Sequence, residues 1–156
     1  MLKLAVITVS DRVSRGEYED RSGPAIAGIL RQAFPDCQLA LDAVADEPAE
    51  IRRVLLAHAD VDAILTSGGT GLSPRDRTPE VTAACCDREV PGVAEWLRHE
   101  SLGETVFSVL SRGYCGVRGQ TLIVNLPGSV AAAEFCTRLL TQVLPHCQAM
   151  IRGGSH

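Results

Sequence analysis

The residues best suited to chemistry lie in one stretch, SGGTGLSPRDRTPE, at positions 67–80. Gly68 and Gly69 lack side chains, so the backbone there can take positive φ and present its N–H groups to an anion. Asp76 follows on the same loop, between two arginines. The stretch predicts either a phosphate-binding turn with a carboxylate beside it or a plain glycine-rich turn with a solvated acid, and its composition alone leaves both open.

The end of that stretch indicates a helix start. Thr78 has the character of a capping side chain, while Pro79 and Glu80 suit the first turn of a helix. Asp76 is therefore expected just before a helix N-terminus, where anions are favoured. The stretch lacks the GxxxxGK[ST] pattern of a Walker P-loop and the GxGxxG pattern of dinucleotide folds.

Two further acids follow apolar runs. Asp11 comes after LAVITVS, and Asp46 comes after QLALDAVA. If these runs are neighbouring parallel strands, both carboxylates lie at the same edge of a sheet as the glycine turn. One or two carboxylates, with phosphate oxygens and water, are what Mg²⁺ on a nucleotide usually takes. Each acid alone is equally a capping or solvated residue, so the prediction of metal-assisted transfer at phosphorus depends on their combination.

Other reactive residue types give weaker predictions. No serine stands in a GxSxG setting, and His58 and His99 are expected to be surface or half-buried residues of helices. Cys115 has glycines and an arginine nearby, which could lower a thiol pKa, but a catalytic role is disfavoured. Trp96 and Phe107 are expected in the core.

The elements that must position these residues alternate along the chain. Apolar β-branched runs predict buried strands, and apolar stripes at i, i+3, i+4 predict helices. The fold class is therefore α/β, three layers with a mostly parallel central sheet, in one domain over residues 1–156. The expected strands are 4–10, 38–45, 61–67, 105–112 and 120–128, and the expected helices lie around 26–34 and at 48–59, 79–87, 91–101 and 130–151, the last bent or ended at Pro145.

Composition restricts the kind of partner. A net charge of −4 disfavours a general nucleic-acid or membrane-surface binder, and the first apolar run is too short to span a bilayer. The six cysteines show neither a CxxC pair nor zinc spacing, as expected of small buried residues in a reducing, cytoplasmic compartment. The terminal GGSH carries no prediction.

Several motifs occur together in a specific order: VSDR, VADE, TSGGTG, RDRTPE, REVPG, LSRG and TLIVNLPGS. This ordered set, from about residue 4 to 150, resembles the MogA/MoaB family of molybdenum-cofactor biosynthesis proteins, which includes the G domains of gephyrin. The resemblance implies a three-layer α/β/α domain assembled as a homotrimer. It further implies adenylylation of molybdopterin by ATP with Mg²⁺, and a molybdenum insertase as a partner.

The resemblance also assigns residues. The functionally important aspartates of the family fall on Asp46 and Asp76, as catalytic and metal-binding groups. Substrate and phosphate contacts fall on Ser10, Asp11, Gly68, Gly69, Thr70, Gly71, Asn125, Leu126, Pro127, Gly128 and Ser129. Val130 stands where the family often has proline. The alternatives are a MoaB-type member that binds molybdopterin without catalysis and an unrelated flavodoxin-like module.

Overall fold

The computed structural model describes residues 1–154, and the last two residues of the GGSH tail lie outside this part. A six-stranded sheet has the order β2-β1-β3-β6-β5-β4. Its strands are β1 (Lys3–Val9), β2 (Gln38–Val44), β3 (Ala63–Ser67), β4 (Arg88–Glu89), β5 (Cys115–Arg118) and β6 (Thr121–Leu126). The first four in this order are parallel, β5 is antiparallel to both of its neighbours, and β4 at the edge therefore runs in the same direction as the first four. The α/β class with a mostly parallel sheet is confirmed.

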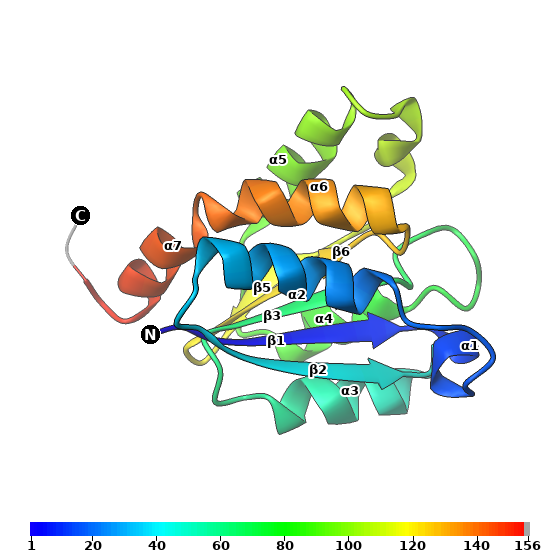
Figure 1. The fold of residues 1–156 in the computed structure, drawn as a ribbon, viewed down its shortest axis with the longest axis horizontal. Coiled ribbons are helices and arrows are strands. Elements are labelled where there is room, and N and C mark those ends of the chain that lie inside the picture. Colours follow the sequence, from blue (N-terminus) through cyan, green and yellow to red (C-terminus); the bar gives the residue numbers. More distant parts are fainter. Residues whose placement is uncertain (155–156) are drawn as a thin grey trace.

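Helices cover both faces of the sheet (Figure 1). One face packs α2 (Ser22–Ala33), α5 (Pro91–Ser101), α6 (Val130–Thr141) and α7 (Leu144–Ile151), and the other packs α3 (Pro48–Ala57) and α4 (Thr78–Cys85). Strand β1 shows why its sequence is a continuous apolar run. Leu4 and Val6 point to the first face, while Ala5 and Ile7 point to the second, and all are buried.

Two predictions were wrong: the strand at 105–112 and the core position of Phe107. Residues 105–112 form no strand; a 3₁₀ helix, η1, covers Val106–Leu110 and leaves Phe107 73% exposed, so Phe107 is not a core residue. The antiparallel strand is β5, which pairs with β6. The closing helix is two helices, with Pro145 in the first turn of α7. Proline is tolerated in a first turn because no N–H is needed there, so the break comes just before it.

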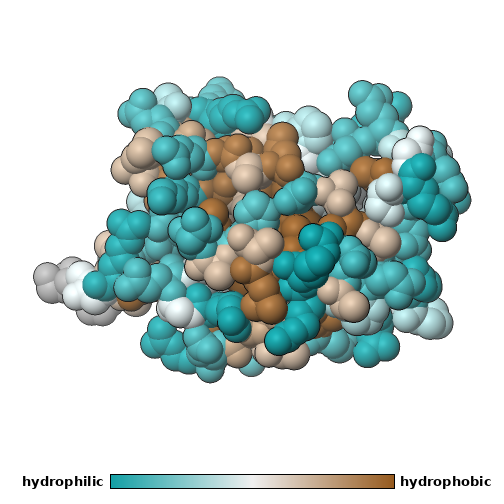
Figure 2. All heavy atoms as spheres, turned by 90° about the horizontal axis from the view of Figure 1, so that it is seen from below, coloured by the Kyte–Doolittle hydropathy of each residue, from teal (hydrophilic) through white to brown (hydrophobic). Residues whose placement is uncertain are grey.

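The strand β2 is an edge of the sheet, and its Leu41 is 45% exposed. Seen from the side of β2 and α3, apolar side chains gather in the middle of the surface with polar ones around them (Figure 2). Among the described residues, no helix combines the length and apolar character needed to cross a bilayer.

The chain changes direction in the sheet at β1, because β2 lies on one side of β1 and β3 on the other. In open α/β sheets such a switch leaves a crevice outside the carboxyl ends of the two central strands. The segments after β1 and β3 therefore flank the expected binding position, and the short helix α1 (Asp11–Ser14) lies there too (Figure 1).

Candidate functional site

The structure places the predicted acids after β1 and β2 against each other. The backbone N–H of Asp11 donates to Oδ2 of Asp46, and the N–H of Asp46 donates to Oδ1 of Asp11, both at 3.0 Å. This reciprocal pair joins the two loops at the carboxyl edge and fixes one oxygen of each carboxylate. Ser10 caps α1 instead, since its hydroxyl accepts from the N–H of Val13 at 3.3 Å.

The side chain of Arg75 contacts the loops after β1 and β2 and does not pair with the neighbouring Asp76. Its guanidinium donates to Oδ2 of Asp11 and to Oε1 of Glu47, each at 2.8 Å. Although Arg75 stands next to Asp76 in the sequence, its guanidinium pairs with Asp11 and Glu47. A loop residue far along the chain instead bridges the acids that follow β1 and β2.

The two joined aspartates have opposite pKa shifts. The hydrogen bond from Arg75 lowers the pKa of Asp11. Burial raises the pKa of Asp46, and the nearby charges of Asp11 and Asp76 raise it further. Asp46 is thus the carboxylate whose charge is costly in the free protein, and a cation placed beside it would be stabilised by relieving that cost.

The glycine turn after β3 is shaped by close contacts. Gly68 has φ 104°, and a Cβ there would lie 2.3 Å from the carbonyl oxygen of Val9. Gly69 has φ 69°, and a Cβ there would lie 2.2 Å from Thr78 Oγ1 and 3.3 Å from Asp46 Oδ1. A Cβ on Gly71 would lie 2.8 Å from Asp76 Oδ2. The turn therefore places bare backbone directly against both predicted catalytic carboxylates.

The N–H groups of this turn are available. The N–H of Gly68 donates to the carbonyl of Leu126 at 3.2 Å. Within residues 1–154, the next three N–H groups, those of Gly69, Thr70 and Gly71, have no hydrogen-bond acceptor. Successive unpaired N–H groups in a turn with positive φ suit an anion such as phosphate. This is the arrangement that the prediction of a phosphate-binding turn requires.

Asp76 lies half-buried on the loop that returns from the turn. Its Oδ2 accepts from the N–H of Ser73 at 3.0 Å, and its own N–H donates to the carbonyl of Ser73 at 2.9 Å. These bonds hold its carboxylate beside Gly71. The negative charge of Asp76 contributes to the raised pKa of Asp46.

Arg112 holds the whole loop and was not assigned a role from the sequence. Its guanidinium donates to the carbonyls of Gly71 at 2.8 Å and Asp76 at 2.7 Å, and it also pairs with Glu80. Its backbone N–H donates to the carbonyl of Thr70 at 2.8 Å. The only signal in the sequence was the motif LSRG, whose contacts lie more than thirty positions away.

We expect Arg112→Lys to open this loop, because one ammonium cannot reproduce the fork that binds both carbonyls. Trypsin should then cleave after Arg75 or Arg77 about tenfold faster, since each charge-assisted bond contributes on the order of 1.5–3 kcal/mol. Arg118→Lys is the matched control, because Arg118 donates to the carbonyl of Cys85 away from the loop. Equal cleavage in wild type and Arg112→Lys would contradict this role.

The prediction that Thr78 caps the following helix was wrong. It is the first residue of α4 rather than its cap, and the N-cap residue Arg77 makes no side-chain capping bond. The hydroxyl of Thr78 is fully buried and has no hydrogen-bond partner among the described residues. The hydroxyl faces Gly69 instead. Thr78 therefore packs against the glycine turn and does not cap the helix.

The last two residues of β6 are held by buried contacts. Asn125 is buried: its Oδ1 accepts from the N–H of Tyr114 at 3.1 Å, and its Nδ2 donates to the hydroxyls of Thr66 and Thr82 at 3.0 Å. Leu126 is fully buried. These contacts give both side chains a structural role in β6, and their contact with substrate stays a prediction.

The residues after Leu126 reach the crevice. Pro127 accepts from the Ser67 hydroxyl at 2.9 Å, and a Cβ on Gly128 would lie 3.3 Å from the Cα of Gly68. Ser129 caps α6 by accepting from the N–H of Ala132 at 3.3 Å. With that cap in place, Val130 starts the helix without a proline.

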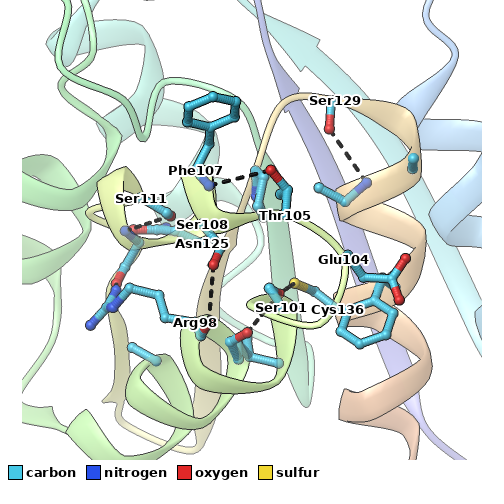
Figure 3. A pocket seen from close by; sticks show the side chains of 17 residues that line it. Arg98, Ser101, Glu104, Thr105, Phe107, Ser108, Ser111, Asn125, Ser129 and Cys136 are labelled. Carbon is cyan, nitrogen blue, oxygen red and sulfur yellow. Dashed lines mark hydrogen bonds between the residues drawn. The ribbon is translucent and has the colours of Figure 1, made fainter.

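A cavity of about 400 Å³ adjoins this loop between α5, η1 and α6 (Figure 3). Its lining is mostly apolar, with Phe107, Phe135 and Leu97, and it includes Asn125, Pro127 and Ser129. Ligand sites are commonly mostly apolar clefts with a few polar groups. This cavity was not predicted from the sequence, because η1 was expected to be a strand.

Cys115 does not lie in an activating environment. It is fully buried, and burial raises the pKa of its thiol. The possibility of a lowered thiol pKa is excluded, because burial outweighs any nearby arginine. Within residues 1–154, no group of three or more His, Cys, Asp or Glu side chains is placed to hold a metal ion.

Comparison with known proteins matches this chain to one family. Residues 5–146 match the family described as "Probable molybdopterin binding domain". The chain is 36% identical over 157 residues to the molybdopterin adenylyltransferase of Helicobacter pylori strain J99, covering 98% of this chain and 89% of that protein. It is also 36% identical to the molybdenum cofactor synthesis protein cinnamon of Drosophila melanogaster, but covers only 26% of that longer protein.

One solved structure is similar to this chain over nearly the full length of both. The molybdopterin biosynthesis enzyme MoaB from Thermus thermophilus superimposes with a TM-score of 0.90 and 46% identity, covering 98% of each chain. The likeness therefore extends over all the elements that build the carboxyl edge.

Proposed function

The chain belongs to the family of probable molybdopterin-binding domains, and from this premise we propose that it is a molybdopterin adenylyltransferase acting in molybdenum cofactor biosynthesis. One observation carries the proposal: the two carboxylates, Asp46 and Asp76, touch the same turn that offers three unpaired N–H groups. Phosphate oxygens and a cation can be held together at such a position.

The reaction is a transfer at phosphorus. The terminal phosphate of molybdopterin attacks the α-phosphorus of ATP, a new P–O bond forms, and pyrophosphate leaves with the electrons of the broken bond. Such a transfer depends on alignment and charge neutralisation more than on a protein nucleophile. The N–H groups of Gly69, Thr70 and Gly71 suit the phosphate chain, and the adjoining cavity offers room for the pterin.

Mg²⁺ fits the donors present. Asp46 has a raised pKa because it is partly buried and lies near other negative charges, which a divalent cation would offset. Asp46 and Asp76 would hold the ion, with water and phosphate oxygens completing its shell. When bound, Mg²⁺ would supply neutralisation of charge on the phosphate oxygens.

The test is release of pyrophosphate from Mg-ATP in the presence of molybdopterin. The proposed enzyme releases pyrophosphate only when both substrates are present and forms adenylylated molybdopterin in equal amount. Binding of molybdopterin without pyrophosphate release would favour the MoaB-type binding member instead.

The pH dependence of this activity follows from Asp46. If the ionised carboxylate is required, activity is lost as pH falls through its raised pKa. Arg75 lowers that pKa by its positive charge, so Arg75→Gln should move the acid limb of kcat/KM to higher pH. Arg53→Gln is the control, since Arg53 pairs with the exposed Glu50. An unmoved limb in Arg75→Gln would remove Asp46 as the titrating group.

Assembly and partners complete the proposal. A homotrimer is supported by exposed apolar residues in η1, where Val106, Phe107 and Val109 are each more than half exposed. A molybdenum insertase as partner is supported by the molybdenum cofactor biosynthesis bifunctional protein of Synechococcus elongatus, of which the chain covers 48% at 42% identity. A cytoplasmic location is supported by cysteines used as buried residues, such as Cys85 and Cys136.

A further inference from the structure

A second, shallower cleft of about 290 Å³ lies between α3 and α4. Its lining includes Ala49 and Arg52 of α3, and Arg77, Glu80 and Val81 around the start of α4. Neither arginine has a role in the site described above. Both are exposed, so both can reach a ligand.

Unlike their neighbours, these two arginines have no carboxylate partner among residues 1–154. Arg75 is held by Asp11 and Glu47, and Arg53 is held by Glu50. Arg52 makes only a 3.8 Å contact to the sulfur of Cys85. Within the described part of the chain, the Arg77 side chain makes no hydrogen bond or ion pair.

The one carboxylate in the cleft is already paired. Glu80 lies close enough to Arg77 for electrostatic attraction, but the group that binds it is Arg112. The guanidinium groups of Arg52 and Arg77 thus leave the cleft with a net positive charge. Guanidinium groups bind phosphate oxygens in pairs, which suits a ligand with several of them.

The cleft is continuous in sequence with the acidic side of the proposed site. Arg77 directly follows Asp76, and Pro48, which also lines the cleft, stands two positions after Asp46. Pyrophosphate that leaves the proposed site carries several negative charges. Arg52 and Arg77, whose charges are not neutralised by a carboxylate among the described residues, are the adjacent groups that can accept them.

We propose that the cleft between α3 and α4 binds a polyphosphate: the β- and γ-phosphates of the nucleotide before transfer and pyrophosphate after it. This inference rests on the proposed adenylyl transfer and adds the site that receives the leaving group. Arg52 and Arg77 bind oxygens of the pyrophosphate unit and do not contact the α-phosphorus.

The experiment measures binding directly by calorimetry, with pyrophosphate, ATP and AMP as three separate ligands at fixed Mg²⁺ and salt. In Arg77→Gln and in Arg52→Gln/Arg77→Gln, pyrophosphate and ATP should bind at least about tenfold more weakly, as for loss of a charge-assisted contact. AMP, which lacks the β- and γ-phosphates, should bind within about twofold of wild type. Arg53→Gln, one position along α3, should change none of the three.

Unchanged pyrophosphate affinity in the double variant overturns the inference, and so does an equal loss of AMP affinity. Thermal unfolding of each variant separates lost binding from lost folding, and the exposed single variant Arg77→Gln keeps the test open if the double variant does not fold. Because binding needs no turnover, absence of adenylylation in wild type would count against the proposed function and not against this site.

Discussion

Asp76→Ala is expected to lower kcat for adenylylation by on the order of 10² or more while the protein stays folded, as for loss of a transition-state contact. Asp76 is half-buried beside Gly71, and its charge is felt by Asp46. Its removal takes away one of two carboxylates that would hold the cation on the phosphates. The measurement is single-turnover formation of adenylylated molybdopterin, with circular dichroism to confirm folding.

The structural part of this effect can be separated from the chemical part. Asp76 also accepts the N–H of Ser73, so alanine loosens the loop as well as removing charge. Asp76→Asn keeps an acceptor for that N–H and removes only the charge, and it should be nearly as inactive. Asp36→Ala, at an exposed acid, is the matched control. Turnover near that of wild type in Asp76→Asn would remove Asp76 from the mechanism.

The central strands that position the site were predictable, because a buried strand requires a recognisable pattern of apolar residues. A parallel strand covered on both faces must be apolar at successive positions, as Ala5, Val6 and Ile7 are, and few other elements need that pattern. The same logic predicts β3 and β6, which are buried along their whole length, and with them the carboxyl edge where the glycine turn lies. The edge strand β2 is mostly exposed, so burial does not account for its prediction.

The misassigned region was ambiguous for a physical reason. The apolar run at Val106–Leu110 has the composition of a strand, but its large apolar side chains are exposed. The intrinsic preference of these residues for a strand is therefore not reinforced by burial in the sheet. The true strand β5 is only four residues long and contains Gly116. A Cβ there would lie 2.8 Å from the carbonyl oxygen of Arg88, so glycine is required by the pairing with β4. That pairing is not visible along the chain.

The contacts that organise the site were also not predictable. Arg75 reaches Asp11, and Arg112 reaches Gly71, across separations of 64 and 41 residues. An arginine in a polar loop has the same local pattern whether it binds a carboxylate, a carbonyl or water. The sequence therefore identified the acids and glycines but not the arginines that hold them in place.

Gly69→Ala is expected to have a large effect on both stability and activity, because the added methyl group causes backbone strain and also a steric clash. Its φ of 69° lies in the left-handed region, and the new Cβ would lie 2.2 Å from Thr78 Oγ1. Strain and overpacking together should lower the free energy of unfolding by about 2–4 kcal/mol. Adenylylation should fall with it, since the turn must move away from Asp46. Urea unfolding and the pyrophosphate assay measure the two effects.

Two variants isolate the causes. Gly119→Ala has a similar φ of 56° but nothing within 4 Å of the new Cβ, so it reports strain alone and should cost about 1–2 kcal/mol. In Gly69→Ala/Thr78→Ala the nearest clashing atom is gone, and the buried hydroxyl that is lost had no partner among the described residues. We expect the double variant to recover at least about 1 kcal/mol of the loss, a coupling typical of residues in contact. If it recovers nothing, the clash with Thr78 is not what requires glycine at position 69, and strain in the turn must account for the whole effect.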